Sequence, residues 1–152
     1  MRQPRQGDSL WVLGDYYTFK LSSAESIGAL AIVELTAFPQ NGPPPHVHGR
    51  EEESFYIMDG TFSVLAGDQT VEAGPGALVH IPRGTLHTYK NIGIRPGRVL
   101  VTLTPGGFEN FWREIGEPGG IDSGPPVPSE GIIQRVMALA PKYHLEIPAP
   151  PH

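Results

Sequence analysis

The chain has 152 residues with no cysteine, 11 basic and 16 acidic residues, and a formal net charge of −5. This length is typical of one domain, and the missing cysteine excludes disulfides and thiolate metal sites. The acidic balance argues against nucleic-acid and anionic-membrane partners. Its first 20 residues lack a signal-peptide core and no run of 18 apolar residues occurs, so we expect a cytoplasmic protein without membrane contact.

Short segments rich in β-branched and aromatic residues fill the first two thirds of the chain. Turns containing glycine or proline separate them, a spacing typical of an all-β domain. Because no helical pattern interrupts the segments, we expect antiparallel strands in a sandwich, jelly roll or barrel. The predicted strands cover residues 9–21 (as two strands), 28–38, 53–58, 61–66, 69–73, 77–82, 86–91 and 98–104.

Two dipeptides between these segments predict tight turns. Asp59-Gly60 is a strong hairpin signal, because a type I′ turn needs positive φ at both central residues. Gly67-Asp68 predicts another turn after the next segment. We therefore expect the segments on either side of Asp59-Gly60 to pair as a hairpin.

The pattern changes after residue 105. A helix is predicted over residues 106–116, because Phe108, Phe111, Trp112 and Ile115 follow helical spacing and Gly116 can end the helix. More often such a stripe packs in a core, but it could also lie across a barrel and narrow the mouth of a pocket.

A linker rich in proline and glycine follows at residues 117–129, and then a second helix is predicted. Ser129 is its expected N-cap. The domain as a whole is expected to span residues 1–152, with a barrel over about 9–105 and a helical extension over about 106–145. The apolar face of the second helix would hold Ile132, Ile133, Val136, Leu139 and Ala140, with Met137 at its margin.

The stretch HVHGREEE at residues 46–53 holds two histidines one residue apart, followed by three glutamates. In a strand, residues i and i+2 share a face, so His46 and His48 point together. Strict alternation from His48 favours Glu52 on the same face. A glycine directly after His48 can shift the register, however, and then Glu53 takes that face together with apolar residues. The residues themselves leave Glu52 and Glu53 as alternatives.

Two segments together resemble the two motifs of the cupin family: GPPPHVHGREEESFYIMDG (42–60) and GALVHIPRGTLHTYKN (76–91). In the first motif six residues separate the glutamate from a glycine, and counting back from Gly60 selects Glu53. Only three residues separate Gly42 from the first histidine, where the family usually has five, which concerns the role of Gly42 alone. The second motif is matched at Gly76, Pro82, Gly84, His87 and Asn91.

This resemblance implies a double-stranded β-helix, the jelly-roll barrel of cupins, with a metal at one end of its interior. The implied metal ligands are His46, His48, Glu53 and His87. Three neutral imidazoles and one carboxylate suit one divalent transition metal: Fe, Mn, Ni, Co, Cu or Zn. Octahedral coordination would leave two positions open for water, substrate or dioxygen. Glu51 and Glu52 are expected to be solvated charges, and His80 a packing or surface residue.

The overall likeness is to small bacterial single-domain cupins of the quercetin dioxygenase-like group. It implies a metal-dependent dioxygenase-like enzyme acting on a small aromatic or enolic compound, with Glu53 as a catalytic proton acceptor, and cupins of this size are often homodimers. The residues leave open whether the protein is an enzyme at all: the alternatives are a non-catalytic cupin that binds or senses a small molecule, and a metal-dependent isomerase or lyase. Candidate substrate-binding residues, for which core packing is the other interpretation, are Phe55, Ile57, Tyr89 and Phe111.

Overall fold

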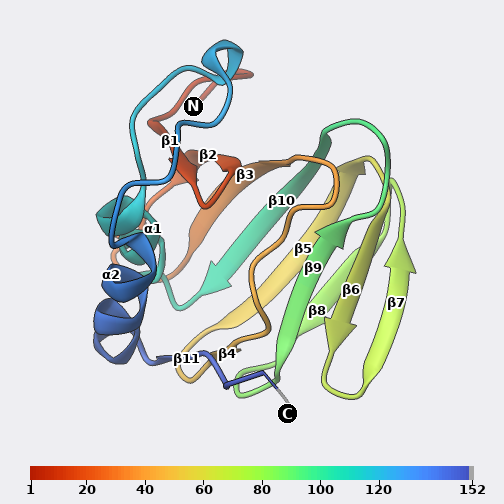
Figure 1. Cartoon of the computed structure of the whole chain (residues 1–152), viewed down its shortest axis with the longest axis vertical. Coiled ribbons are helices and arrows are strands. Elements are labelled where there is room, and N and C mark those ends of the chain that lie inside the picture. Colours follow the sequence, from red (N-terminus) through yellow and green to blue (C-terminus); the bar gives the residue numbers. More distant parts are fainter. Residues whose placement is uncertain (151–152) are drawn as a thin grey trace.

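The computed structural model describes residues 1–150 and confirms the predicted all-β fold with two short α-helices. Figure 1 shows two layers of antiparallel strands that face each other. The larger layer is a six-stranded sheet in the order β1-β2-β3-β10-β5-β8. Its strands are β1 (Ser9–Val12), β2 (Asp15–Leu21), β3 (Ala31–Ala37), β10 (Gly97–Thr104), β5 (Glu52–Asp59) and β8 (Leu78–Ile81).

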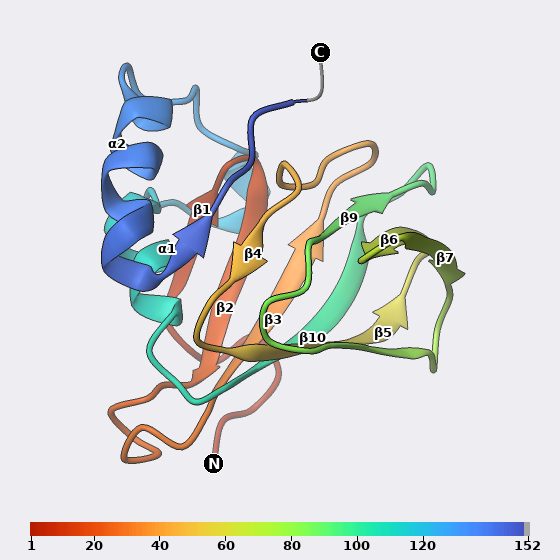
Figure 2. The same ribbon diagram turned by 90° about the horizontal axis from the view of Figure 1, so that it is seen from below.

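The smaller layer contains the sheet β7-β6-β9, built from β7 (Gln69–Ala73), β6 (Phe62–Ala66) and β9 (His87–Asn91). An isolated bridge between His46 and His87 extends this layer toward β4 (Val47–His48), which pairs with β11 (Leu145–Glu146). The view in Figure 2 places β4 between β9 and the C-terminal segment. Strand β11, near the C-terminus, thus extends the layer that carries His46 and His87.

Strict alternation of side chains explains where the core lies. In β3, Ala31, Val33, Leu35 and Ala37 are buried and the residues between them are partly exposed. A pleated strand directs alternate side chains to opposite faces, so the apolar set points between the layers. On the outer face Glu34 of β3 accepts two bonds from the Arg98 guanidinium of β10, at 3.1 and 2.8 Å. The core therefore occupies the space between the two layers.

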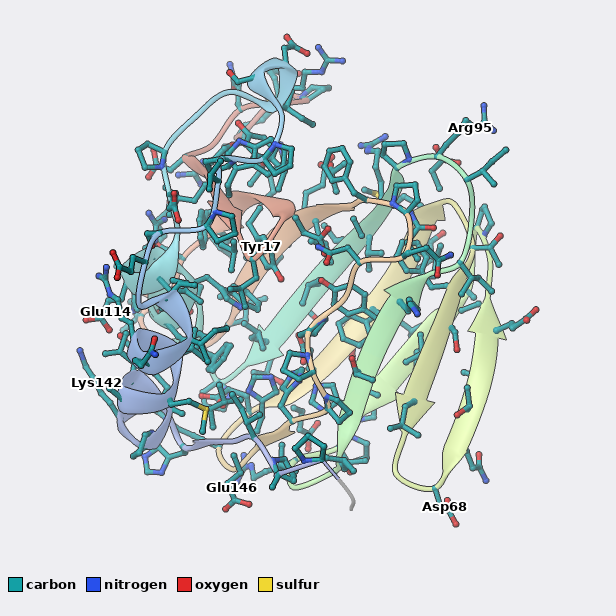
Figure 3. The ribbon with its side chains drawn as sticks, in the orientation of Figure 1. Tyr17, Asp68, Arg95, Glu114, Lys142 and Glu146 are labelled. Atoms are coloured by element: carbon teal, nitrogen blue, oxygen red, sulfur yellow. The ribbon has the colours of Figure 1, made fainter. Side chains whose placement is uncertain are left out.

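The expected hairpin at Asp59-Gly60 is wrong. Strand β5 pairs with β10 and β8, whereas β6 pairs with β7 and β9, so this turn carries the chain from one layer to the other. Gly60 has a φ of +90°, and a Cβ there would lie 2.9 Å from the Cα of Gly97, so both conformation and space require glycine. Gly67-Asp68 does join a hairpin, β6 to β7, and Asp68 lies at its tip in Figure 3.

Helix α1 (Glu109–Ile115) forms where the apolar stripe predicted it, and all four stripe residues are buried. Glu109 is also fully buried, and its two carboxylate oxygens accept backbone N–H groups of Ser23 and Gly107 at 2.6 and 2.7 Å. These bonds fasten the start of α1 to the loop that precedes β3.

Helix α2 (Ile132–Leu139) lies between two short 3₁₀ helices, η1 (Ile121–Ser123) and η2 (Ala140–Tyr143). The predicted N-cap Ser129 is wrong: Gly131 is the N-cap, in a left-handed conformation with φ of 79° that suits glycine. On the outer side of the helices Lys142 contacts both carboxylate oxygens of Glu114 at 3.0 Å (Figure 3). Within residues 1–150 no helix is long and apolar enough to cross a membrane.

Candidate metal centre

Four side chains from three separate parts of the chain converge at one end of the barrel. His46 and His48 lie beside or in β4, Glu53 is the second residue of β5, and His87 begins β9. One possible ligand atom from each lies within 4.8 Å of those of the others. The structure therefore brings together the four residues that the sequence motifs indicated as metal ligands.

Backbone bonds fix the relative positions of these histidines. The N–H of His46 donates to the carbonyl of His87 at 3.0 Å, and the N–H of His87 donates back at 2.9 Å. The two rings consequently lie side by side, with centroids 4.3 Å apart. His48 is held by the pairing of β4 with β11, and the next residue, Gly49, donates its N–H to the carbonyl of His144 at 2.8 Å.

The register around Gly49 decides between the two glutamates that the sequence left as alternatives. Glu53 is 4% exposed and faces the histidines, with its Oε2 atom 2.9 Å from Nε2 of His87 and 3.2 Å from Nε2 of His48. Glu52 points outward, where its half-exposed carboxylate lies 3.5 Å from the His80 ring. The inward carboxylate is therefore Glu53, and His80 is a surface residue as expected.

Backbone carbonyls set the tautomers of two histidines. Nδ1 of His46 lies 2.9 Å from the Pro44 carbonyl, and Nδ1 of His87 lies 2.8 Å from the Thr85 carbonyl. A carbonyl can only accept, so both Nδ1 atoms carry the hydrogen and both neutral rings turn an Nε2 lone pair away from it. Orienting bonds of this kind are a regular feature of metal-binding histidines.

The donor set fits a divalent cation. Among the described residues neither ring nitrogen of His48 has a hydrogen-bond partner, although the side chain is only 2% exposed. Buried polar atoms are normally paired, and a neutral imidazole carries one N–H and one lone pair. One unpaired nitrogen of His48 can therefore bind a cation, and Nε2, 3.2 Å from Oε2 of Glu53, is the one that faces the cluster. Likewise, Nε2 of neutral His87 and the carboxylate of Glu53 are two acceptors in contact, which requires a proton or a cation between them.

The charges of the site support the same conclusion. Burial, reinforced by the neighbouring histidines, lowers the pKa of His46 to about 4, so this ring is neutral near pH 7. Burial alone would raise the pKa of Glu53, but His48 and His87 outweigh it and hold that pKa below its ordinary value. Burial also opposes protonation of His87, yet the Glu53 carboxylate raises the pKa of His87. A proton shared by His87 and Glu53 is therefore the competitor that a metal must displace.

Glu51 is a correction to the sequence-based expectation of a solvated charge. It is 3% exposed, and its Oε2 atom lies 3.7 Å from Nδ1 of His48 without a hydrogen-bond partner among residues 1–150. Burial raises the pKa of this carboxyl. The distance is too long for a direct bond, but the carboxylate lies on the side of His48 that faces away from Glu53. A carboxylate behind a ligand histidine orients the ring and raises its basicity.

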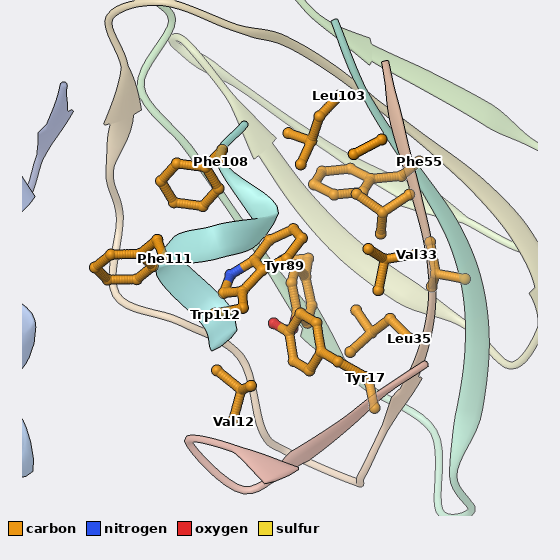
Figure 4. Close-up of a cluster of buried hydrophobic side chains, with 14 of the residues drawn as sticks. Val12, Tyr17, Val33, Leu35, Phe55, Tyr89, Leu103, Phe108, Phe111 and Trp112 are labelled. Carbon is orange, nitrogen blue, oxygen red and sulfur yellow. The ribbon is translucent and has the colours of Figure 1, made fainter. Parts of the chain in front are cut away.

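A cavity of about 210 Å³ adjoins this cluster, and two of the four side chains, His46 and Glu53, form part of its wall. Of the predicted substrate-binding residues, Phe55, Tyr89 and Phe111 line it. Ile57 does not: it shares the inward face of β5 but lies in the packed core, beside a separate smaller void. Figure 4 shows Trp112 on the side of α1 that faces Tyr17 and Tyr89, and Phe111 on the opposite side of the helix.

Several wall residues could not be found from the motifs. Phe108 contacts the ring of His48 edge-on, with centroids 4.2 Å apart, and Trp112 packs against Tyr17 at 4.9 Å. Asp15, a buried carboxylate on β2, also lines the cavity. Their only signals in the sequence were an apolar helical stripe and a β-rich run, neither of which specifies a cavity.

The two facing layers and the inward His, His, Glu and His side chains define a double-stranded β-helix with a candidate metal centre. Residues 35–103 match the family model described as a cupin domain. Over these residues the chain is similar to cupin domains, in agreement with its two motifs.

Two curated relatives illustrate the match. The chain is 32% identical over 73 residues to a quercetin 2,3-dioxygenase of Bacillus subtilis (strain 168), an alignment that covers 48% of this chain and 21% of that enzyme. It is 27% identical over 92 residues to an uncharacterized protein of Streptomyces coelicolor, covering 60% of this chain and 81% of that protein. The match thus spans about one fifth of the length of the dioxygenase.

Solved structures share the fold at low identity. A predicted oxalate decarboxylase from Thermotoga maritima superposes with a TM-score of 0.64 at 17% identity, covering 69% of this chain and 98% of that one. A polyketide cyclase from Streptomyces resistomycificus gives a TM-score of 0.54 at 24% identity, covering 66% and 69%. At these identities the likeness shows the fold alone.

Proposed function

We propose that the protein is a metal-dependent cupin enzyme that carries out dioxygenase-type chemistry on a small aromatic or enolic compound. The observation that carries this proposal is the position of His46 and Glu53, which belong both to the donor cluster and to the wall of the cavity. A compound in the cavity would therefore contact the metal centre directly. Most of the remaining wall is apolar, as is usual for sites that bind small molecules.

The four clustered side chains would be the metal ligands. A divalent transition metal held by His46, His48, Glu53 and His87 would supply Lewis acidity and open positions for a substrate oxygen and dioxygen. With three neutral imidazoles the ligand set carries a charge of −1. We assign Glu53 the further role of accepting the proton of a substrate hydroxyl, because its carboxylate reaches the cavity and can share a proton with Nε2 of His87.

The aromatic wall would position the substrate. Phe55 and Tyr89 meet edge-on with ring centroids 5.8 Å apart, and Phe111 contributes from α1. Flat, rigid aromatic surfaces favour a ring or a conjugated enol over a flexible polar chain. Within residues 1–150 no lysine or arginine lines the cavity, which argues against a phosphorylated sugar as substrate.

The sequence comparison supports the type of reaction. The dioxygenase of Bacillus subtilis carries the name of an aromatic substrate and is 32% identical to this chain over 73 residues. Because the alignment covers 21% of that enzyme, it supports a related chemistry and does not define the substrate of this chain. A homodimer and a cytoplasmic location remain predictions from the sequence.

The test begins with elemental analysis of protein purified without chelator or immobilised metal. The metal-loaded protein is then screened for dioxygen uptake with a panel of phenols and enols, with His87→Ala as the metal-deficient control. We expect uptake by the wild type only. Turnover that persists under argon would replace the proposal with an isomerase or lyase. A rise in melting temperature without turnover would replace it with a non-catalytic binding protein.

A further inference from the structure

A chain of buried polar groups lies in the wall of the cavity, apart from the histidines. The hydroxyl of Tyr89 donates to Oδ2 of Asp15 at 3.0 Å, and the hydroxyls of Tyr17 and Tyr89 are 3.4 Å apart. Asp15, Tyr17 and Tyr89 are 2%, 6% and 8% exposed, and all three line the cavity. Polar groups in such an apolar wall are costly to bury and are usually either structural or used to bind a ligand.

The two carboxylate oxygens of Asp15 have different partners. Its Oδ1 atom accepts the backbone N–H of Phe38 at 3.0 Å and the side-chain amide of Asn41 at 2.8 Å. These bonds fix the carboxylate to the loop after β3. Its Oδ2 atom accepts only from Tyr89 among the described residues, which directs this oxygen and the two phenols toward the cavity.

The number of hydroxyl protons shows which of these three polar groups can donate a hydrogen bond to a ligand. Tyr89 uses its single proton for Asp15, so toward Tyr17 it can only accept. The 3.4 Å separation from Tyr17 is well beyond the usual 2.7–2.8 Å of an O–H···O bond, which makes this bond weak. Burial and then the charge of Asp15 raise the pKa of Tyr17, so its hydroxyl remains a proton donor near pH 7. The hydroxyl of Tyr17 is therefore the last group of this hydrogen-bonded series, and its proton makes only a weak hydrogen bond within the protein.

Phe55 lies near both this end of the cavity and the metal centre. Its ring centroid is 6.3 Å from that of His87 and 5.8 Å from that of Tyr89, and its ring forms part of the cavity wall. The volume of about 210 Å³ is suited to a single substituted ring, since a dry cavity of about 150 Å³ holds benzene. Asp15 also makes this end unfavourable for a second anion.

We propose that Tyr17, backed by Tyr89 and Asp15, is a second anchoring point that hydrogen-bonds a neutral hydroxyl or carbonyl oxygen of the ligand. This inference rests on the proposed function. It narrows the substrate class to a one-ring or similarly sized compound with two oxygen functions on opposite sides. One oxygen, deprotonated, faces His46 and Glu53, and the other, neutral, faces Tyr17.

Two probes of nearly equal size test the proposal by equilibrium binding. Zinc-loaded protein, chosen because zinc has no redox chemistry, is titrated calorimetrically with 4-hydroxybenzoate and with 4-methylbenzoate. The carboxylate serves both probes at the metal end, and only the first carries an oxygen for Tyr17. We expect the wild type to bind 4-hydroxybenzoate about tenfold more tightly, the usual difference made by one buried hydrogen bond.

Tyr17→Phe should remove this preference while leaving the affinity for 4-methylbenzoate unchanged. Tyr16→Phe is the matched control: Tyr16 is the adjacent residue of β2, its hydroxyl donates to the Gly119 carbonyl at 3.3 Å, and it does not line the cavity. Tyr89→Phe, which breaks the link to Asp15, provides a second test if Tyr17→Phe does not fold, and should reduce the preference.

Three outcomes would overturn the anchoring point. The wild type could bind both probes equally well, it could bind neither probe, or the preference for 4-hydroxybenzoate could survive in both Tyr17→Phe and Tyr89→Phe. The readout requires no turnover, so it separates this inference from the proposed function. Absence of dioxygen uptake with a retained, Tyr17-dependent preference would contradict the enzyme and support the anchoring point. Dioxygen uptake without a preference for 4-hydroxybenzoate would support the enzyme and contradict the anchoring point.

Discussion

The segment that matches the cupin family and the segments that flank it contribute different things to the site. Residues 35–103 supply all four side chains of the candidate metal centre. The flanking segments supply much of the cavity wall, including Asp15 and Tyr17 from β2 and the aromatic residues of α1. The candidate metal ligands and much of the cavity wall therefore come from different parts of the chain.

The two regions are also held in place differently. Reciprocal backbone bonds join His46 to His87, and the strand pairing of β4 holds His48, so the geometry of the centre depends on main-chain contacts. The wall formed by α1 depends on side-chain packing, such as that of Trp112 against Tyr17. Substitutions in the wall should therefore change ligand choice and stability without disturbing metal binding. Substitutions in the centre should weaken metal binding and leave the fold intact.

The largest expected effect is the loss of metal from His87→Ala and from His48→Ala. Each variant removes one of four donors, while the apolar core that stabilises the barrel stays intact. We expect near-stoichiometric metal in the wild type, little in the variants, and unchanged far-ultraviolet circular dichroism. His80→Ala, which removes an exposed histidine, is the control. Full metal content with unchanged affinity in His87→Ala would show that the cluster is not the metal site.

In the wall, Phe111→Ala should lower the free energy of unfolding by about 3 kcal/mol, near the lower end for Phe→Ala, because the ring already borders a cavity. Metal content should stay at the wild-type level, and binding of ring-shaped ligands should weaken. Denaturant titration and elemental analysis check both parts. The control is Leu78→Ala on β8, whose largely exposed side chain lies outside the cavity wall, so its loss should cost little. Loss of metal from Phe111→Ala would contradict the division between centre and wall.

The same division explains what the sequence could predict. Local alternation located the strands, and the resemblance to two family motifs indicated the four donors, because both the alternation and each motif depend on residues close together in the chain. The turn at Asp59-Gly60 was misassigned because β5 pairs with β10, about 40 residues later, and not with its neighbour β6. Hairpin signals report local conformation and carry no information on such distant pairing.

Residues that acquire their role through distant contacts escaped prediction for the same reason. Glu51 is buried near β4, and the pairing of β4 with β11 joins residues almost 100 positions apart. Asp15 was also missed, because its partner Tyr89 lies 74 positions away and no local pattern links the two. The predicted cap at Ser129 failed because a left-handed Gly131 begins α2 instead, a choice that depends on how the linker approaches the helix.

Glu51 allows an intermediate test within the centre. Glu51→Gln keeps the shape of the side chain but removes the charge next to Nδ1 of His48, and loss of such an orienting carboxylate typically weakens metal affinity about 10–100-fold. Competition with a chromogenic chelator measures this change. Glu52→Gln, one residue away and outward-facing, should leave the affinity unchanged. Equal effects of the two substitutions would indicate a general electrostatic influence and no orienting role for Glu51.

The smallest expected effect is a pH dependence of the metal-free protein that arises from His46. The folded state holds its pKa at about 4, while in the unfolded chain it returns to about 6.5. Between these values the unfolded state binds more protons, so the free energy of unfolding should fall as the pH is lowered from about 6.5 to about 4.

In His46→Gln this contribution is absent, and denaturant titrations in chelator should show a shallower fall over the same range. The difference should be modest because His46 is only partly buried. Identical slopes for the two proteins would mean that His46 is as easily protonated in the folded barrel as in water.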